Sequence, residues 1–249
     1  MASMTLQTDQ PAQATSSSFP GRGAWWSVCT LLAFGLMEAA LFEALKIAPT
    51  EKTMGIYQRI FYVHVPSFIA GFTAFAINFL ASVAYLWRRT LKADALAVAA
   101  AEVGVAFTAI GLITGPIWAK PIWGIWWTWD ARLTLTLVLW VMYVSYLMLR
   151  QLTPANEQQP RLAAVLAVFF FLDVPIDYMA IRWWPTQHPQ PVFFGGPKSG
   201  VAEPIAVAFL ISAIAFLALA ALLFWQRYRL ECDRQKLAAV RRELALRQA

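Results

Sequence analysis

The sequence is poor in cysteine, in histidine and in charge, and the first and last shortages each exclude a class of protein. Its two cysteines, Cys29 and Cys232, lie far apart, one in an apolar run and one in a basic segment. They can form no CxxC redox motif, no cysteine-based zinc site and no disulfide framework. Charged residues make up 14% of the 249 positions and hydrophobic residues 59%, whereas soluble domains carry about 25% charge. This composition argues against a soluble globular enzyme and indicates that a bilayer solvates much of the chain.

The apolar residues form six runs, each long enough to cross a hydrocarbon core of roughly 30 Å as a helix. They predict an all-α, polytopic integral membrane protein with one six-helix domain over 25–226, because no connector reads as a separate folded domain. The Ser- and Gln-rich segment 1–24 is expected to be a disordered tail, and 227–249 a charged helical tail. The predicted spans are 25–45, 62–86, 96–117, 133–150, 162–180 and 204–226.

Lys and Arg set the predicted orientation. The net charge of +6 would favour nucleic acid in a soluble protein, but here the basic residues mark membrane sidedness, and no nucleic-acid partner is predicted. A basic cluster at 88–92 and the pair Arg227 and Arg229 place both termini in the cytoplasm. The segments 46–64, 118–132 and 181–203 then face the outer side.

Tryptophan is concentrated in the second outer segment. Five of the twelve tryptophans lie between 118 and 129. If 123–130 is helical, three of these rings and Asp130 share one face and form a flat aromatic platform for a large planar ligand. The alternative is an aromatic belt at the headgroups, and both interpretations stay open. The five are Trp118, Trp123, Trp126, Trp127 and Trp129.

The two histidines, His64 and His188, both fall on the predicted outer side. A single histidine at a membrane boundary is usually a side chain whose polar end reaches the headgroups. Two histidines on the same side as the tryptophan run favour a pair of metal ligands. Zinc needs three or four protein ligands, whereas a porphyrin supplies four nitrogens itself and takes up to two axial ligands. The pattern predicts non-covalent haem b, since no Cys-x-x-Cys-His motif is present.

A haem also brings two propionates, which need cationic partners near an apolar interface. Arg132 is the first candidate because its planar fork meets a carboxylate in bidentate fashion, and Lys120 and Arg182 flank the same region. The alternatives are an Arg132–Asp130 ion pair and snorkelling anchors.

The run Trp123-Gly124-x-Trp126-Trp127-x-Trp129-Asp130-Ala131-Arg132 resembles the WWD signature of haem-handling membrane proteins. Together with His64-Val65-Pro66 and Trp183-Trp184-x-Thr186-x-His188, it is similar to the haem exporter protein C family, CcmC, of the bacterial cytochrome c maturation system. The resemblance covers about 25–226. The run Gln187-His188-Pro189 departs from Leu-His-Gln, which is frequent in the family.

The resemblance implies a six-helix protein of the bacterial inner membrane that binds haem at its periplasmic face. It implies His64 and His188 as axial ligands of the iron, the tryptophans from 123 to 129 as the haem-contacting face, and Arg132 as the propionate partner. Its implied partners are subunits of an ABC-type transporter, a small single-span membrane subunit and a periplasmic haem chaperone. Trp118, Asp130, Trp183 and Trp184 complete the predicted haem-binding set.

The predicted function is binding and hand-over of haem, a role that needs moderate affinity, because irreversible retention would block transfer. No catalytic residue is predicted, and a part in ligating haem to the acceptor stays open. One alternative is a membrane b-type haem oxidoreductase that uses the same histidines for electron transfer. Its difficulties are that both histidines lie at span ends and that no third histidine exists for a second haem. A permease subunit with purely anchoring tryptophans is the third interpretation.

Two carboxylates inside the fifth span remain without an assigned function. Asp173 and Asp177 are four residues apart and share a helix face, and Pro175 is expected to kink the helix between them. Ionisable groups inside a span are functional suspects. A structural or partner-contact role is favoured here. One alternative places Asp177 near the headgroups, paired with Arg182, and Asp173 protonated or hydrogen-bonded to another span.

Overall fold

The structure, a computed structural model, describes residues 24–153, 158–189, 200 and 202–248. The described residues are almost entirely helical and contain no strand. Six helical segments are long and apolar enough to cross a membrane, and each contains one of the predicted spans. The all-α class and the six spans are therefore confirmed, and the chain is a multi-pass membrane protein. Apart from Ala24, the predicted tail 1–24 lies outside the described residues.

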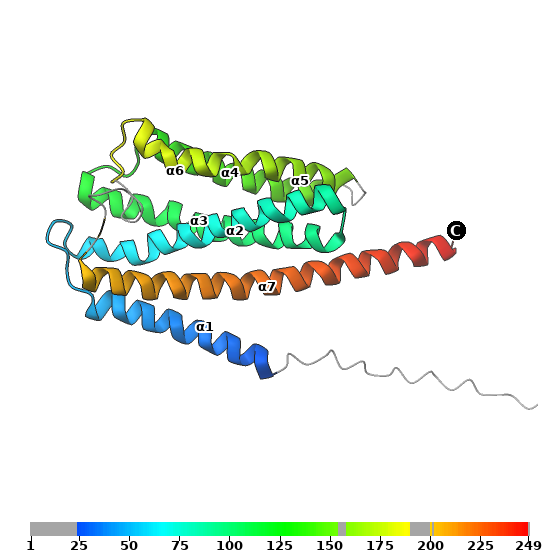
Figure 1. The fold of residues 1–249 in the computed structure, drawn as a ribbon, viewed down its shortest axis with the longest axis horizontal. Coiled ribbons are helices and arrows are strands. Elements are labelled where there is room, and N and C mark those ends of the chain that lie inside the picture. Colours follow the sequence, from blue (N-terminus) through cyan, green and yellow to red (C-terminus); the bar gives the residue numbers. More distant parts are fainter. Residues whose placement is uncertain (1–23, 154–157, 190–199, 201, 249) are drawn as a thin grey trace, which may run out of the picture.

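The helices form an elongated bundle in which successive spans run in opposite directions (Figure 1). The fifth span divides at Leu172 into two helices, so the break that Pro175 causes lies one turn earlier than predicted, before Asp173 and not between Asp173 and Asp177. Proline lacks the N–H that would bond to the Phe171 carbonyl, and its ring clashes with that carbonyl. The helices are α1 (Ala24–Phe42), π-helix η1 (Glu43–Ile47), 3₁₀-helix η2 (Ile56–Ile60), α2 (Phe61–Arg88), α3 (Leu91–Trp123), α4 (Ala131–Leu152), α5 (Gln158–Phe171), α6 (Asp173–Trp183) and α7 (Glu203–Gln248).

Small residues let α2 and α3 approach closely at the centre of the bundle. Gly104 on α3 lies directly against the Phe75 ring, so that an added Cβ would fall 2.3 Å from that ring. Buried alanines of α2 and α3 also allow a short separation between the helices. In a membrane the hydrophobic effect does not drive helices together, so close packing of this kind supplies much of their association energy. Phe75 also stacks on Tyr143 of α4, with ring centroids 3.7 Å apart.

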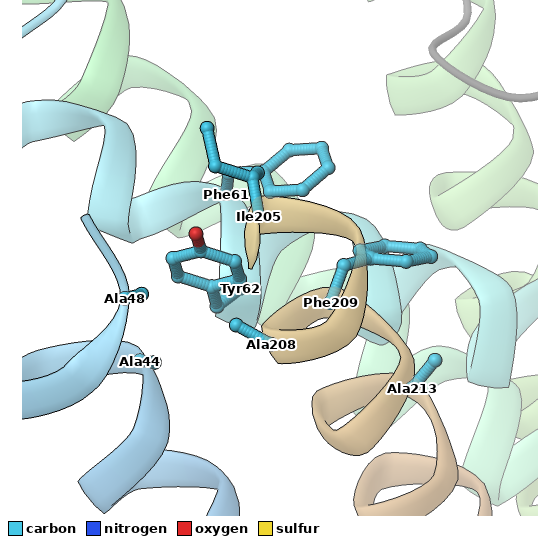
Figure 2. Close-up of a cluster of buried hydrophobic side chains, with 8 residues drawn as sticks. All are labelled: Ala44, Ala48, Phe61, Tyr62, Ile205, Ala208, Phe209 and Ala213. Atoms are coloured by element: carbon cyan, nitrogen blue, oxygen red, sulfur yellow. The ribbon is translucent and has the colours of Figure 1, made fainter. Parts of the chain in front are cut away.

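A buried apolar cluster fixes the first turn of α2 (Figure 2). Phe61 and Tyr62 pack there against η1 and the start of α7, and the Phe61 ring lies 5.1 Å from that of Phe209. Since His64 follows two residues later, this cluster sets the position of the first predicted ligand. Its members are Ala44, Ala48, Phe61, Tyr62, Ile205, Ala208, Phe209 and Ala213.

Ion pairs join the helices at the opposite end of the bundle. Arg150 of α4 makes two hydrogen bonds to Asp94 of α3, at 2.6 and 2.8 Å, and Gln235 of α7 donates to the same carboxylate. Arg227 pairs with Glu102. From this end, α7 continues as one helix through the basic segment to Gln248, beyond the ends of the other helices (Figure 1).

Candidate functional site

Three connecting segments gather at one end of the bundle, which we call the site end (Figure 1). They are 48–55 between η1 and η2, 124–130 between α3 and α4, and 184–189 after α6. These correspond to the three segments predicted to share one side of the membrane, so the topology brings both histidines and the tryptophan run to the same end. Which side of a membrane this end faces stays a prediction.

His64 lies in the first turn of α2 and is 8% exposed. Its Nδ1 is 3.0 Å from the Thr114 hydroxyl of α3. That hydroxyl donates its single proton to the Ile110 carbonyl at 2.8 Å, so it can only accept from the imidazole. The ring proton of His64 therefore sits on Nδ1, and the lone pair is on Nε2. Phe68 and Trp118 pack edge-on against the ring.

His188 reaches the same tautomer by a different contact. Its Nδ1 lies 2.9 Å from the Pro189 carbonyl oxygen, and because a carbonyl only accepts, Nδ1 must carry the proton. Its backbone N–H donates to the Thr186 hydroxyl at 3.0 Å. The lone pair of His188 is likewise on Nε2, the atom through which a metal would be bound.

The two imidazoles lie within electrostatic range of one another, and both feel the charge of Arg132. Burial, followed by the nearby Arg132 guanidinium, lowers the pKa of His188 from 6.5 to about 4. The His188 ring is therefore neutral at pH 7, which is the form of imidazole that coordinates metals.

Asp130 ties the segments of the site end together. Its Oδ1 accepts the backbone N–H of Leu133 at 3.0 Å and caps the N-terminus of α4. Its Oδ2 accepts the hydroxyls of Thr128 at 3.0 Å and Thr186 at 2.9 Å. One carboxylate thus fixes the start of α4 and, through Thr186, the backbone of His188.

The helical tryptophan face predicted over 123–130 is wrong, because α3 ends at Trp123. Gly124 follows in the left-handed region with φ 77°, which glycine adopts without steric cost and which terminates the helix. The ammonium of Lys120, one of the flanking cations, donates a hydrogen bond to the Gly124 carbonyl at 2.8 Å. The chain from Gly124 to Asp130 is not helical, so the tryptophans do not lie on one helix face.

The tryptophans instead divide between two clefts and the surface. Trp127 and Trp129 meet edge to face, with centroids 5.9 Å apart, and line an apolar groove of about 470 Å³ between α3 and α4. Trp123 borders a separate cleft of about 580 Å³ beside the segment 52–57. Trp126 is 58% exposed. Leu112, Pro116 and Leu137 complete the groove of Trp127 and Trp129.

The other predicted tryptophans take different positions. Trp118 points into the bundle and packs against His64 and Phe61. Trp183 ends α6 and Trp184 follows it; the two rings meet edge to face at 5.7 Å, and both are about half exposed.

Arg132 forms its ion pair with Asp177 of α6. It pairs neither with Asp130 nor with a solvent-facing group. Its Nη1 lies 3.4 Å from Asp177 Oδ2 and also donates to the Asp177 carbonyl oxygen. The Asp177 side chain is fully buried, and the Thr136 hydroxyl lies 3.1 Å from both carboxylate oxygens. The structure therefore shows Asp177 paired with Arg132 and not with Arg182, whose guanidinium lies over the Tyr178 ring.

Comparison with known proteins matches the sequence of this chain to a family. A family model described as Heme exporter protein C matches residues 10–243. The chain belongs to the Heme exporter protein C family. A relative of that name from Bradyrhizobium diazoefficiens is 33% identical over 228 residues, which cover 90% of this chain and 84% of the relative. One from Haemophilus influenzae is 32% identical over 196 residues, covering 79% and 80%. One from Escherichia coli K12 is 38% identical over 143 residues, covering 57% and 58%.

Three residues that hold the histidines of this Heme exporter protein C family member in place were not predicted from the sequence. Thr114 sets the His64 tautomer, Thr186 anchors His188, and Gly115 leaves room for the His64 ring, since an added Cβ would lie 3.3 Å from its Cε1. Thr186 falls inside the third motif, but the contact of Thr114 spans fifty residues and leaves no local pattern.

Proposed function

We propose that this protein binds haem at the site end through His64 and His188 and surrenders it to a protein acceptor during cytochrome c maturation. The observation that carries the proposal is that Nδ1 of each imidazole lies 2.9–3.0 Å from a fixed protein oxygen, so that Nε2, which makes no hydrogen bond among the described residues, is the atom available to a metal. A second hydrogen bond that fixes the tautomer is the usual support of a metal-binding histidine.

The donor set suits an iron porphyrin. Among the described residues, no three His, Cys, Asp or Glu side chains gather in a metal site. Two neutral imidazoles meet the requirement of a porphyrin iron, which brings its own four nitrogens. Trp127 and Trp129 would offer apolar contact to the macrocycle, and Arg132 would offer charge to its propionates.

Hand-over is favoured by the openness of the site end. Trp126, Trp129, Trp183 and Trp184 are each roughly half exposed or more, so a bound macrocycle would keep an edge accessible to an acceptor. The name of the relatives, Heme exporter protein C, agrees with a role in haem delivery.

By family membership we further propose the cellular setting. The site end faces the periplasm, both termini face the cytoplasm, and the membrane is the bacterial inner membrane. The acceptor is a periplasmic haem chaperone, and the chain works beside ABC-type transporter subunits and a small single-span subunit.

The visible spectrum of the protein purified in detergent tests the binding step. The loaded wild type should have the spectrum of a six-coordinate, low-spin haem. His64→Ala and His188→Ala should each lose that spectrum while keeping the helical content of the wild type. If either variant retained the full low-spin spectrum, the proposed ligand pair would be wrong.

Mixing the loaded protein with a purified haem-free acceptor tests the transfer step. Loss of haem from this chain with an equal gain in the acceptor supports hand-over. In a parallel mixture of the dithionite-reduced, ferrous protein with an oxidised cytochrome, one-electron oxidation of the bound haem and reduction of the cytochrome without movement of haem would instead support the alternative oxidoreductase.

A further inference from the structure

Arg132 and Asp177 form a buried pair, and Arg132 lies within electrostatic range of both histidines. Helix packing alone does not explain this pair. Removing two charges from water is costly, and similarly sized apolar residues often stabilise a protein as well or better. The Asp177 carboxylate is fully buried and the Arg132 side chain is 14% exposed. Such a pair is weak support for the fold, so its charges call for another explanation.

The geometry leaves Arg132 partly available to a ligand. Its contacts with Asp177, at Oδ2 and at the backbone carbonyl, both use Nη1. Within the part of the chain that the structure describes, no protein hydrogen bond engages Nη2 or Nε of Arg132. A guanidinium carries five donors in a rigid fork, so one edge can bind Asp177 while the other meets a second carboxylate.

We propose that Asp177 is a positioning residue that limits how strongly Arg132 holds an anionic ligand and thereby promotes release of haem. This inference rests on the proposed function. Asp177 and a haem propionate compete for the same cation, because the Asp177 carboxylate offsets part of the charge that would otherwise attract the propionate. Thr136 moderates the competition, because its hydroxyl shares its single proton between the Arg132 carbonyl, 2.9 Å away, and the Asp177 carboxylate oxygens, 3.1 Å away.

The test compares haem with haem dimethyl ester, whose propionates carry no charge. Each is loaded into the full-length protein, and its release to excess apomyoglobin is followed by absorbance. Asp177→Asn keeps the shape of the side chain and removes its charge, so haem release should slow by about tenfold, the effect of one charge-assisted contact. Release of the dimethyl ester should stay unchanged.

Thr136→Val supplies a second, milder variant. Without the hydroxyl, Asp177 should draw Arg132 more strongly, and haem should leave faster than from the wild type, again with no effect on the ester. Asp173→Asn is the matched control: Asp173 lies on the same face of α6 and within electrostatic range of Arg132, but makes no ion pair with it. Its effect on release should be much smaller than that of Asp177→Asn.

Two results would overturn the inference. One is release of haem from Asp177→Asn at or above the wild-type rate. The other is an equal change for haem and its ester, which would indicate a general loosening of the site. Either could occur while the low-spin spectrum still depended on His64 and His188, so the inference can fail alone. If the wild type took up neither porphyrin, the proposed function itself would fail.

Discussion

Thr114→Val isolates the contact that prepares His64 for iron. Valine has nearly the same shape as threonine, so the substitution removes the acceptor of the Nδ1 proton and little else. Because His64 is 8% exposed, water has poor access to replace the lost partner. The ring is then left with the Gly111 carbonyl as its only Nδ1 contact among the described residues, or it moves its proton to Nε2, where that proton blocks the lone pair.

The structure sets the expected size of this effect. A buried donor that loses its partner costs about 1–3 kcal/mol. Substitutions of residues that orient a metal-binding histidine lower metal affinity by about 10- to 100-fold. The 3.0 Å separation of His64 Nδ1 and Thr114 Oγ1 is that of a normal hydrogen bond. We therefore expect Thr114→Val to weaken haem binding at least tenfold.

Haem titration of the purified variants, followed at the Soret band, measures this change. Thr134→Val is the matched control, because the Thr134 hydroxyl is buried and has no hydrogen-bond partner among the described residues. That variant should bind haem like the wild type. If Thr114→Val also bound within twofold of the wild type, the argument from the His64 tautomer would be refuted.

Three further predictions concern the surrounding structure. Asp130→Ala removes the N-terminal cap of α4 and the hydrogen-bond acceptor of Thr186. It should lower the free energy of unfolding by about 1–2 kcal/mol and reduce haem retention. An unchanged melting temperature would contradict the role of the cap. Arg150→Ala leaves the buried Asp94 carboxylate with the neutral Gln235 amide but without its cationic partner. It should destabilise the protein by about 3–5 kcal/mol in denaturant unfolding, more than Arg150→Ala combined with Asp94→Asn. The pKa of His188 near 4 means that falling pH protonates this ring only close to pH 4, so haem uptake limited by His188 should persist well below pH 6.5; a midpoint near 6.5 would show an ordinary solvated histidine.

The architecture was predictable because the length of an apolar run is a local property. All six spans appear where hydrophobicity places them, and Pro175 marks the break in the fifth. Alternating directions then bring the segments with His64 and His188 to one end without further information.

The details of the site depend on contacts that no local pattern encodes. The aromatic run from 123 to 130 has helical spacing, but α3 ends at Trp123, the first residue of that run, because Gly124 caps it. Gly124 was the one feature of the sequence that could have predicted this helix end. Asp177 meets Arg132 across 45 residues, whereas the sequence offered the nearer Arg182. Which arginine Asp177 meets is decided by the packing of α4 against α6, so sequence spacing alone misassigned it.

Near-infrared magnetic circular dichroism of the loaded ferric protein tests the central claim most directly, because it identifies the axial ligands of haem iron. We expect a bis-histidine signature in the wild type, its loss in both His64→Ala and His188→Ala, and its recovery in each when free imidazole is added. A wild-type spectrum with one histidine and a different second ligand, or a bis-histidine signature that survives either substitution, would contradict the proposed ligand pair.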